Sequence, residues 1–251
     1  MPITIKSESE IQKMRLAGKV VAQTLEYIKN NLKAGVTTKY LDKLTDEFIK
    51  SKGAIPSFKN YNGYPASVCI SVNQEVIHGI PSNKKINHGD VVSVDVGAIL
   101  NGYHGDAART FIVGETSDEN KKLVEVTQQS FFEGIKFAKC GNHLFEISAA
   151  IQDFVEANGF SVVKDYVGHG IGTKMHEAPE IPNYRQNKRG PRLDKNMTLA
   201  IEPMVNIGTD QIIVLDDDWT VETADGKCSA HYENTILITD GDPEILTATD
   251  F

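Results

Sequence analysis

The sequence is poor in cysteine and in basic residues, and it has no long hydrophobic run. Its three cysteines, Cys69, Cys140 and Cys228, are odd in number and far apart, so they form neither a CxxC metal motif nor a disulfide framework. Such usage is typical of a reducing compartment. Lys and Arg number 26 against 34 Asp and Glu, and the resulting net charge of -8 argues against a nucleic-acid-binding surface.

The start of the chain, MPITIKSESE, lacks the apolar stretch of a signal peptide. No segment approaches the roughly 18 consecutive apolar residues that a membrane span needs. These absences predict a cytoplasmic protein with no membrane partner and no direct nucleic-acid substrate. The 251 residues, 40% of them hydrophobic, are enough to build a core without disulfides or a structural metal.

Two helices followed by short strands are predicted in the first half of the chain. An S-x-x-E capping box at residues 7–10 precedes apolar residues at helical spacing, which predicts a helix that ends at Gly35. A second helix is predicted from Thr37 or Thr38 to Gly53, followed by strands near residues 68–72 and 91–99.

The second half repeats this order, with helices predicted from about Ser117 and over residues 144–157. At an offset of 106 residues, Gly35 and Gly53 match Gly141 and Gly159, and the apolar positions between them also match. Any two amphipathic helices that end in glycine would share much of this spacing, so coincidence stays an alternative. A duplication predicts one domain, residues 1–251, made of two pseudo-symmetric halves at roughly 1–113 and 114–251, with a site where they meet.

The stretch DVGAILNGYHGD, residues 95–106, carries an aspartate at each end of a predicted hairpin. Two β-type runs, 91–99 and 104–113, are joined through Asn101-Gly102, a strong hairpin signal. If these two residues form the loop, Asp95 lies opposite Ala108 and Gly97 lies opposite Asp106. Both aspartates then share one face of the sheet as diagonal neighbours.

Two carboxylates this close on a half-buried sheet need a compensating charge. Arg109 is near, but it lies three residues from Asp106 on the same predicted strand, so its side chain points to the opposite face. The explanation is then either a divalent cation or a structural pair of carboxyl groups. Further ligand types follow: His169 in a predicted glycine-rich loop (VGHGIG), Glu202 in the apolar run TLAIEPM, and Glu233 on a predicted strand. Each alone has a simpler structural explanation. Together the five side chains would suit two metal ions bridged by shared carboxylates: Asp95, Asp106, His169, Glu202 and Glu233.

The chain resembles the type I methionine aminopeptidases over essentially its whole length, and five short stretches carry the resemblance. They are SVNQEVIHGIP (71–81), VDVG with HGDAART (94–110), GHGIGTKMHEAP (168–179), AIEPM (200–204) and YENT (232–235). The resemblance implies an α+β pita-bread fold, in which two pseudo-symmetric halves pack helices on a curved antiparallel sheet. It also implies a monomeric metallopeptidase that removes the initiator methionine from nascent proteins and peptides when the second residue is small, with the ribosome as a candidate partner.

The same resemblance implies roles for individual residues. The five clustered side chains named above would bind two divalent ions such as Co, Mn or Fe, with a monovalent cation nearby. Glu202 would also move a proton, His176 would contact the substrate carbonyl, and His78 would contact the scissile amide. The methionine pocket would be aromatic and sulfur-bearing, which suits a thioether: Phe58, Tyr61, Tyr64, Cys69, Met175 and Trp219.

Some residues beside the ligands depart from the usual family pattern, in which Thr, Gln and His are frequent where Ala200, His231 and Asn234 stand here. His231 shares a predicted strand face with Glu233 and is a candidate additional site residue. Two alternative functions stay open at this point. A Xaa-Pro aminopeptidase or prolidase would use the same ligands but usually carries a further N-terminal domain, and a catalytically inactive pita-bread binding protein would have lost ligands.

Overall fold

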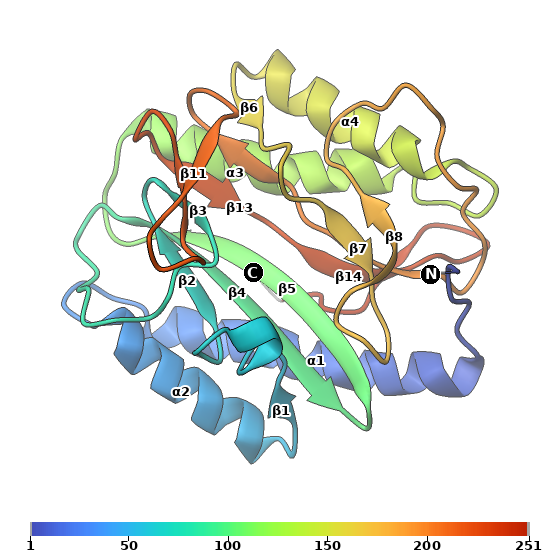
Figure 1. Cartoon of the computed structure of the whole chain (residues 1–251), viewed down its shortest axis with the longest axis horizontal. Coiled ribbons are helices and arrows are strands. Elements are labelled where there is room, and N and C mark those ends of the chain that lie inside the picture. The colour runs from blue at the N-terminus through green and yellow to red at the C-terminus, as the bar shows by residue number, and fades with distance from the viewer. Residues whose placement is uncertain (1, 250–251) are drawn as a thin grey trace.

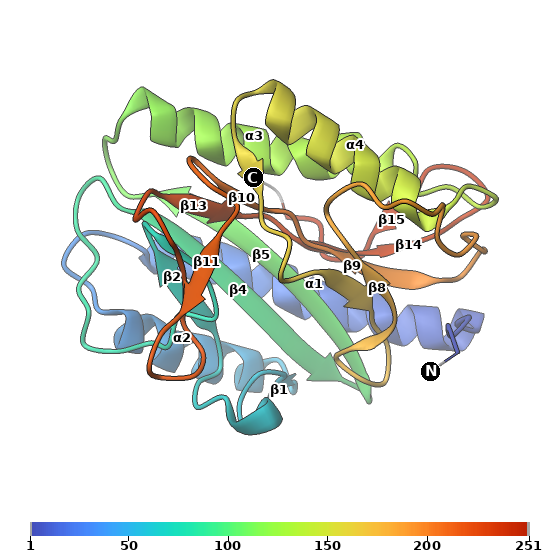
Figure 2. The ribbon, with the colours of Figure 1, turned by 45° about the horizontal axis from the view of Figure 1, so that its top comes forward.

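A long β-hairpin runs through the middle of the molecule, between two pairs of helices (Figure 1). The structure, a computed structural model, describes residues 2–249. Figures 1 and 2 both place α1 (Glu8–Asn31) and α2 (Thr38–Ser51) on one side of the sheets and α3 (Asp118–Ile135) and α4 (Leu144–Ala157) on the other. None of the helices in the described part of the chain is long and apolar enough to cross a bilayer.

Local capping chemistry sets where the first helix begins. The Ser7 hydroxyl accepts the N–H of Glu10, and the Glu10 carboxylate accepts the N–H of Ser7, so the predicted capping box is confirmed. The predicted end at Gly35 is wrong, because the helix stops at Asn31 and Leu32 already has an extended backbone. Gly35 instead sits in the following turn with φ +91°, where its N–H donates to the carbonyl of Ile86.

The second helix of each pair has the same length and the same flanking glycines. Helices α2 and α4 are both 14 residues long, and their first residues, Thr38 and Leu144, stand 106 residues apart. The flanking glycines at positions 35, 53, 141 and 159 all have positive φ, so the matched glycines meet the same backbone requirement in both halves. The division of the domain near residue 113, and its origin by duplication, stay predictions.

The hairpin has the predicted register. Strands β4 (Val91–Leu100) and β5 (Tyr103–Ile112) are antiparallel, with Asp95 opposite Ala108 and Gly97 opposite Asp106. The loop residues Asn101 and Gly102 have φ of 54° and 80°, as a two-residue type I′ turn requires. Because opposed residues share a face, both aspartates point to the same side of the hairpin.

Two larger sheets and two smaller ones are assembled from the remaining strands. The hairpin sheet also contains β1 (Ile55–Pro56) and β2 (Cys69–Val72), and the second large sheet has the order β15 (Glu244–Ile245), β14 (Asn234–Leu237), β9 (Thr198–Ile201), β7 (Gly168–Gly170) and β8 (Glu177–Ile181). The smaller sheets are β13 (Ser229–His231), β10 (Met204–Asn206) and β6 (Ser161–Val162), and β11 (Ile212–Val214), β12 (Val221–Thr223) and β3 (Glu75–Ile77). Mutual backbone hydrogen bonds between Ala108 and Glu233 join the hairpin to the second sheet.

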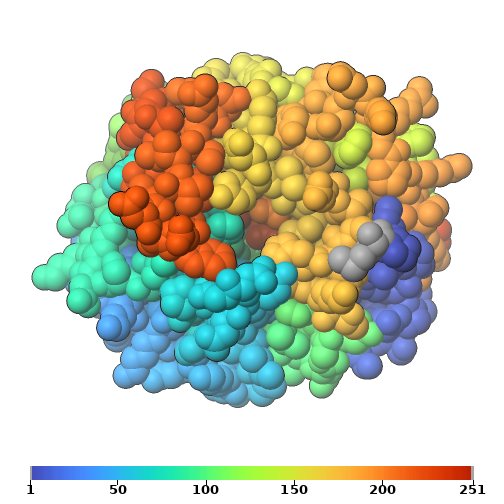
Figure 3. Space-filling view, in the orientation of Figure 1, coloured from blue at the N-terminus to red at the C-terminus, as the bar shows by residue number. Residues whose placement is uncertain are grey.

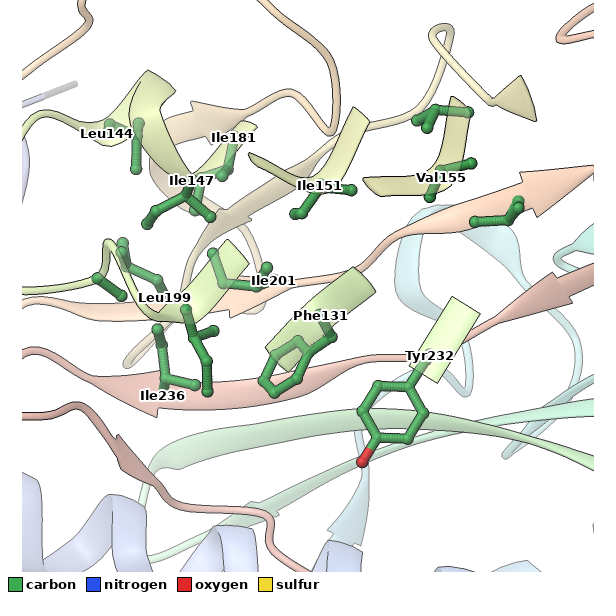
Figure 4. Close-up of a cluster of buried hydrophobic side chains, with 14 of the residues drawn as sticks. Phe131, Leu144, Ile147, Ile151, Val155, Ile181, Leu199, Ile201, Tyr232 and Ile236 are labelled. Atoms are coloured by element: carbon green, nitrogen blue, oxygen red, sulfur yellow. The ribbon is translucent and has the colours of Figure 1, made fainter. Parts of the chain in front are cut away.

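Each half has its own hydrophobic core against these sheets. In the second half, Phe131 of α3 and the inner face of α4 pack on the sheet beneath them (Figure 4). In the first half, Val21, Leu25 and Ile28 of α1 pack with Val94 and Val96 of the hairpin. The two cores pack against the sheets from opposite sides, and this packing fixes the positions of the polar residues between the sheets.

Candidate active site

A cavity of about 220 Å³ opens where the hairpin meets the second large sheet. In the space-filling view it is the hollow bounded by the orange-red, cyan and gold segments (Figure 3). It is lined by every residue for which the sequence predicted a metal or substrate role: Phe58, Tyr61, Tyr64, Cys69, His78, Asp95, Asp106, His169, Met175, His176, Glu202, Trp219 and Glu233. The sequence did not single out four further lining residues: Asn62, Ile77, Tyr166 and Val167. Two of these, Asn62 and Ile77, stand directly beside predicted residues in the sequence, but their own side chains carried no chemical signal.

The acidic wall of the cavity is assembled from strands of both halves. Asp95 lies on β4 and Asp106 on β5, whereas His169 lies on β7. Glu202 follows β9 directly, and Glu233 directly precedes β14. The predicted continuous strand through His231 and Glu233 is wrong, because the strand breaks between β13 and β14 where Glu233 pairs with Ala108 of β5.

The imidazole of His169 lies among the carboxylates. Its Nε2 is 3.8 Å from Oδ2 of Asp106 and 3.6 Å from Oε1 of Glu202, and one ligand atom each of Asp106, His169 and Glu233 lie within 4.8 Å of one another. Its Nδ1 is 2.9 Å from the carbonyl of Gly170, an acceptor that requires the hydrogen on Nδ1. The lone pair on Nε2 is therefore directed toward the carboxylates, as in histidine ligands of metal ions.

Burial disfavours the charged forms of these side chains. It raises the pKa of Asp95 to about 7, and burial together with neighbouring carboxylates raises the pKa values of Asp106 and Glu233 well above their usual range. Burial raises the pKa of Glu202 in the same way and lowers the pKa of His169 to about 3. Divalent cations would remove this penalty, because they stabilise ionised carboxylates and bind neutral imidazole.

Several carboxylate oxygens in the cluster have no hydrogen-bond partner among the described residues. They are Oδ1 of Asp95, Oδ1 of Asp106 and Oε1 of Glu233, all buried. A buried polar atom without a partner is rare and calls for an unseen ion or water. The set of hard oxygens and one nitrogen fits divalent metal ions of the Mn, Fe or Co type.

The guanidinium of Arg109 does not neutralise the charge of the two aspartates, in agreement with the prediction that its side chain points to the opposite face of the sheet. Its Nη1 donates to the main-chain carbonyl of Glu233 at 2.6 Å, and its Nη2 donates to Oδ1 of Asn234 at 2.8 Å. The guanidinium also lies over the ring of Tyr232, 4.3 Å from its centre. This contact set places Asn234, one of the departures from the family pattern, beside the arginine rather than in the cavity.

The glycines around His169 have a different role from the predicted one. The segment is a central strand, β7, and not a loop that leaves room for a ligand. A Cβ on Gly168 would lie 2.4 Å from the carbonyl oxygen of Ala200, and a Cβ on Gly170 would lie 2.2 Å from that of Ala178. The glycines therefore let β7 pack closely between its neighbours, which places His169 at the required depth.

Two further histidines, His78 and His176, line the same cavity. Tyr61 Oη lies 2.7 Å from Nδ1 of His176, and the His176 ring meets that of His169 edge-on, with centres 4.2 Å apart. His78 has φ +60°, an uncommon backbone conformation for a residue with a side chain, and its ring meets Tyr166 and Trp219 edge-on. The sequence did not indicate this backbone strain.

An apolar cluster also lines the cavity. Phe58, Tyr64, Cys69 and Met175 are buried, with Trp219 partly buried against them. The Tyr64 hydroxyl donates to main-chain carbonyls, so its aromatic ring is held in place. Burial raises the pKa of the Cys69 thiol, which keeps this wall neutral. An uncharged, aromatic and sulfur-bearing pocket thus adjoins the acidic cluster.

Comparisons with known proteins agree with this geometry. Metallopeptidase family M24 matches residues 12–240. A methionine aminopeptidase of Clostridium acetobutylicum is 57% identical over 246 residues, with 98% of each chain covered, and methionine aminopeptidase 1 of Bacillus subtilis is 52% identical over 98% of this chain and 99% of its own.

Solved structures show the same architecture. A methionine aminopeptidase from Thermotoga maritima superposes with a TM-score of 0.96 at 48% identity, over 98% of this chain and 99% of its own. A prolidase from Pyrococcus furiosus has a TM-score of 0.81 at 23% identity, over 98% of this chain but 66% of its own, which shows a shared fold alone. The predicted pita-bread fold is confirmed.

Proposed function

The chain belongs to metallopeptidase family M24, among its methionine aminopeptidases, and we propose that it removes the N-terminal methionine from polypeptides whose second residue is small. The family resemblance found in the sequence is thereby confirmed, and the comparisons do not favour the prolidase or the inactive binding protein. One observation carries the proposal: an acidic, imidazole-containing cluster and a neutral apolar pocket share one cavity.

Five residues would hold two divalent ions in this cavity: Asp95, Asp106, His169, Glu202 and Glu233. Their support is the burial of the carboxylates and the unpartnered oxygens of Asp95, Asp106 and Glu233. When bound, the ions would supply a water activated for attack on a carbonyl carbon. A monovalent cation bound nearby is part of the proposal.

Glu202 would transfer the proton. Its side chain borders the cavity and is 13% exposed, so it can reach both the cavity and the buried cluster. In the proposed reaction its carboxylate accepts the proton of the attacking water and gives it to the departing amine.

His176 would stabilise the substrate carbonyl. If the Tyr61 hydroxyl donates to Nδ1 of His176, the ring hydrogen sits on Nε2, which is then free to donate to the carbonyl oxygen as negative charge develops there. His78 lines the same cavity and would contact the scissile amide.

The apolar cluster would receive the methionine side chain. Its members Phe58, Tyr64, Cys69 and Met175 offer aromatic edges and sulfur, which pack favourably on a thioether. Tyr61 and Trp219 would border the pocket toward its opening. Because no charged group lies within this cluster, a lysine or glutamate side chain would lose its hydration there without gaining a partner.

The remaining parts of the proposal concern the setting of the reaction. We take the N-terminal methionine of nascent polypeptides as the substrate, a monomer in the cytoplasm as the acting form and the ribosome as a partner.

A peptide assay tests the function directly. The metal-free protein would be loaded with Mn²⁺ and offered Met-Ala-Ser, Met-Trp-Ser and an Xaa-Pro peptide, with parallel samples kept in chelator. We expect cleavage of Met-Ala-Ser alone and only with metal. Efficient cleavage of the Xaa-Pro peptide would assign the chain to the alternative peptidases, and cleavage of Met-Trp-Ser would overturn the requirement for a small second residue. The absence of any cleavage with metal would favour the inactive binding protein.

A further inference from the structure

A buried imidazole outside the five predicted ligands lies against Glu202. His231 is 1% exposed, and its Nε2 has no hydrogen-bond partner among the residues that the structure describes. This nitrogen lies 3.9 Å from Oε2 of Glu202. Burying an imidazole nitrogen without a partner is unfavourable, so its position needs a reason.

The backbone holds this imidazole in place independently of the cavity. The N–H of His231 donates to Oγ1 of Thr110 at 2.9 Å, and the same hydroxyl donates to the carbonyl of His231 at 2.8 Å. Thr110 lies on β5, the strand that also carries Asp106. His231 pairs across the ladder with Met204, two residues after Glu202. Both ends of the His231–Glu202 contact are therefore anchored to strands that carry or adjoin ligands.

The two oxygens of Glu202 face two different imidazoles. Oε1 lies 3.6 Å from His169, whose Nε2 carries a lone pair directed at the cluster, whereas Oε2 lies 3.9 Å from His231. A lone pair on Nε2 of His231 would repel an ionised carboxylate, but an N–H at the same place would attract it. The chemistry of the pair therefore favours a hydrogen on Nε2 of His231.

We propose that His231 is a positioning residue for Glu202, donating from Nε2 to Oε2 of the ionised carboxylate and leaving Oε1 directed at the metal centre. This inference rests on the proposed function, because it takes Glu202 to be a ligand of the bound metal. A hydrogen bond to one oxygen of a ligating carboxylate fixes its orientation and strengthens the site. Movement of less than an ångström would bring the two atoms to hydrogen-bond distance.

Three substitutions separate this role from simple space filling. His231→Leu keeps much of the volume but has no donor. His231→Gln carries an amide nitrogen about as far from the backbone as Nε2, whereas the amide of His231→Asn ends one bond short, near the position of Nδ1. Glutamine can therefore replace the proposed donor and asparagine cannot.

The decisive measurement is the affinity of the metal-free full-length chain for Mn²⁺ by titration calorimetry. We expect the Leu and Asn variants to bind about tenfold more weakly or worse, and the Gln variant to stay within about threefold of the wild type. Thermal unfolding in chelator should show no loss of stability in the Leu variant, because it removes an unpartnered buried nitrogen. Should the Leu variant not fold, the comparison of Asn with Gln carries the test.

Two results would overturn the inference. One is Mn²⁺ affinity in the Leu and Asn variants within about threefold of the wild type. The other is a Gln variant as weak as the Leu variant, which would mean that the imidazole itself is required, as a metal ligand would be. If all variants bind Mn²⁺ equally well and the enzyme is active, the positioning role of His231 is refuted but the proposed function stands. A wild-type chain that neither bound Mn²⁺ nor cleaved Met-Ala-Ser would sink the proposed function as well.

Discussion

Oδ2 of Asp106 lies 3.8 Å from Nε2 of His169, although the first residue belongs to the hairpin of the first half and the second to β7 of the second half. Neither half carries the whole ligand set. The first contributes two aspartates, and the second contributes the histidine and two glutamates. The proposed metal centre therefore forms only when the two halves pack together, and metal binding should be coupled to that packing.

Removing a proposed ligand should abolish turnover without unfolding the protein. We expect Asp106→Ala and His169→Ala each to lower kcat/KM for Met-Ala-Ser by about a thousandfold or more, because ligand loss removes several kcal/mol of transition-state stabilisation. Circular dichroism would check folding, and Asp118→Ala at the exposed start of α3 serves as the matched control. Activity near that of the wild type in either ligand variant would contradict the assignment.

The stability of the metal-free protein should fall as pH rises toward neutrality. Burial raises the pKa of Asp95 to about 7, so the folded state keeps a proton that the unfolded chain releases above about pH 4. The stabilisation from this group is therefore complete below about pH 4 and is lost as pH rises through about 7. In chelator, Tm should drop more between about pH 5.5 and 7.5 in the wild type than in Asp95→Asn, which has no such proton to lose. Parallel slopes in the two proteins would refute this.

The capping box should give a stability term with the opposite pH dependence. The Ser7 hydroxyl and backbone N–H lower the pKa of Glu10 to about 2. A lowered pKa contributes stability that is present above about pH 4.5 and is lost as pH falls toward 2. Acid unfolding of Glu10→Gln should therefore depend less on pH in this range.

Ser7→Ala should lower the free energy of unfolding by about 1 kcal/mol in urea titrations at neutral pH, and no change there would mean that the cap contributes nothing.

Arg109 should contribute more to stability than any exposed ion pair. It is 4% exposed and bonds the carbonyl of Glu233 and the side chain of Asn234, which would lose their donor in Arg109→Met. We expect that variant to lose about 3 kcal/mol of unfolding free energy, measured by urea denaturation. Arg15→Met, which removes a half-exposed pair with Glu244, should cost less than about 1 kcal/mol. Equal losses in the two variants would count against this ranking.

Much of the site was predictable because its parts are local. The Asn101-Gly102 turn and the two-residue period of a strand were enough to place Asp95 and Asp106 on one face. The glycines beside His169 were misread, because their role depends on the carbonyls of strands β8 and β9, which the sequence alone does not place next to them. The end of α1 at Asn31 was also missed, since Gly35 meets a turn that contacts Ile86 rather than a helix cap.

Interactions among residues close together in the chain specify the capped helix starts and the hairpin register, and the residue types specify the chemistry of the ligands. How the two halves meet depends instead on long-range packing. The break in the strand at Glu233, the strained backbone of His78 and the contact of His231 with Glu202 all depend on segments far apart in the chain. Such contacts follow from the packing of two cores against shared sheets, and no local pattern of residues encodes the distances that this packing creates.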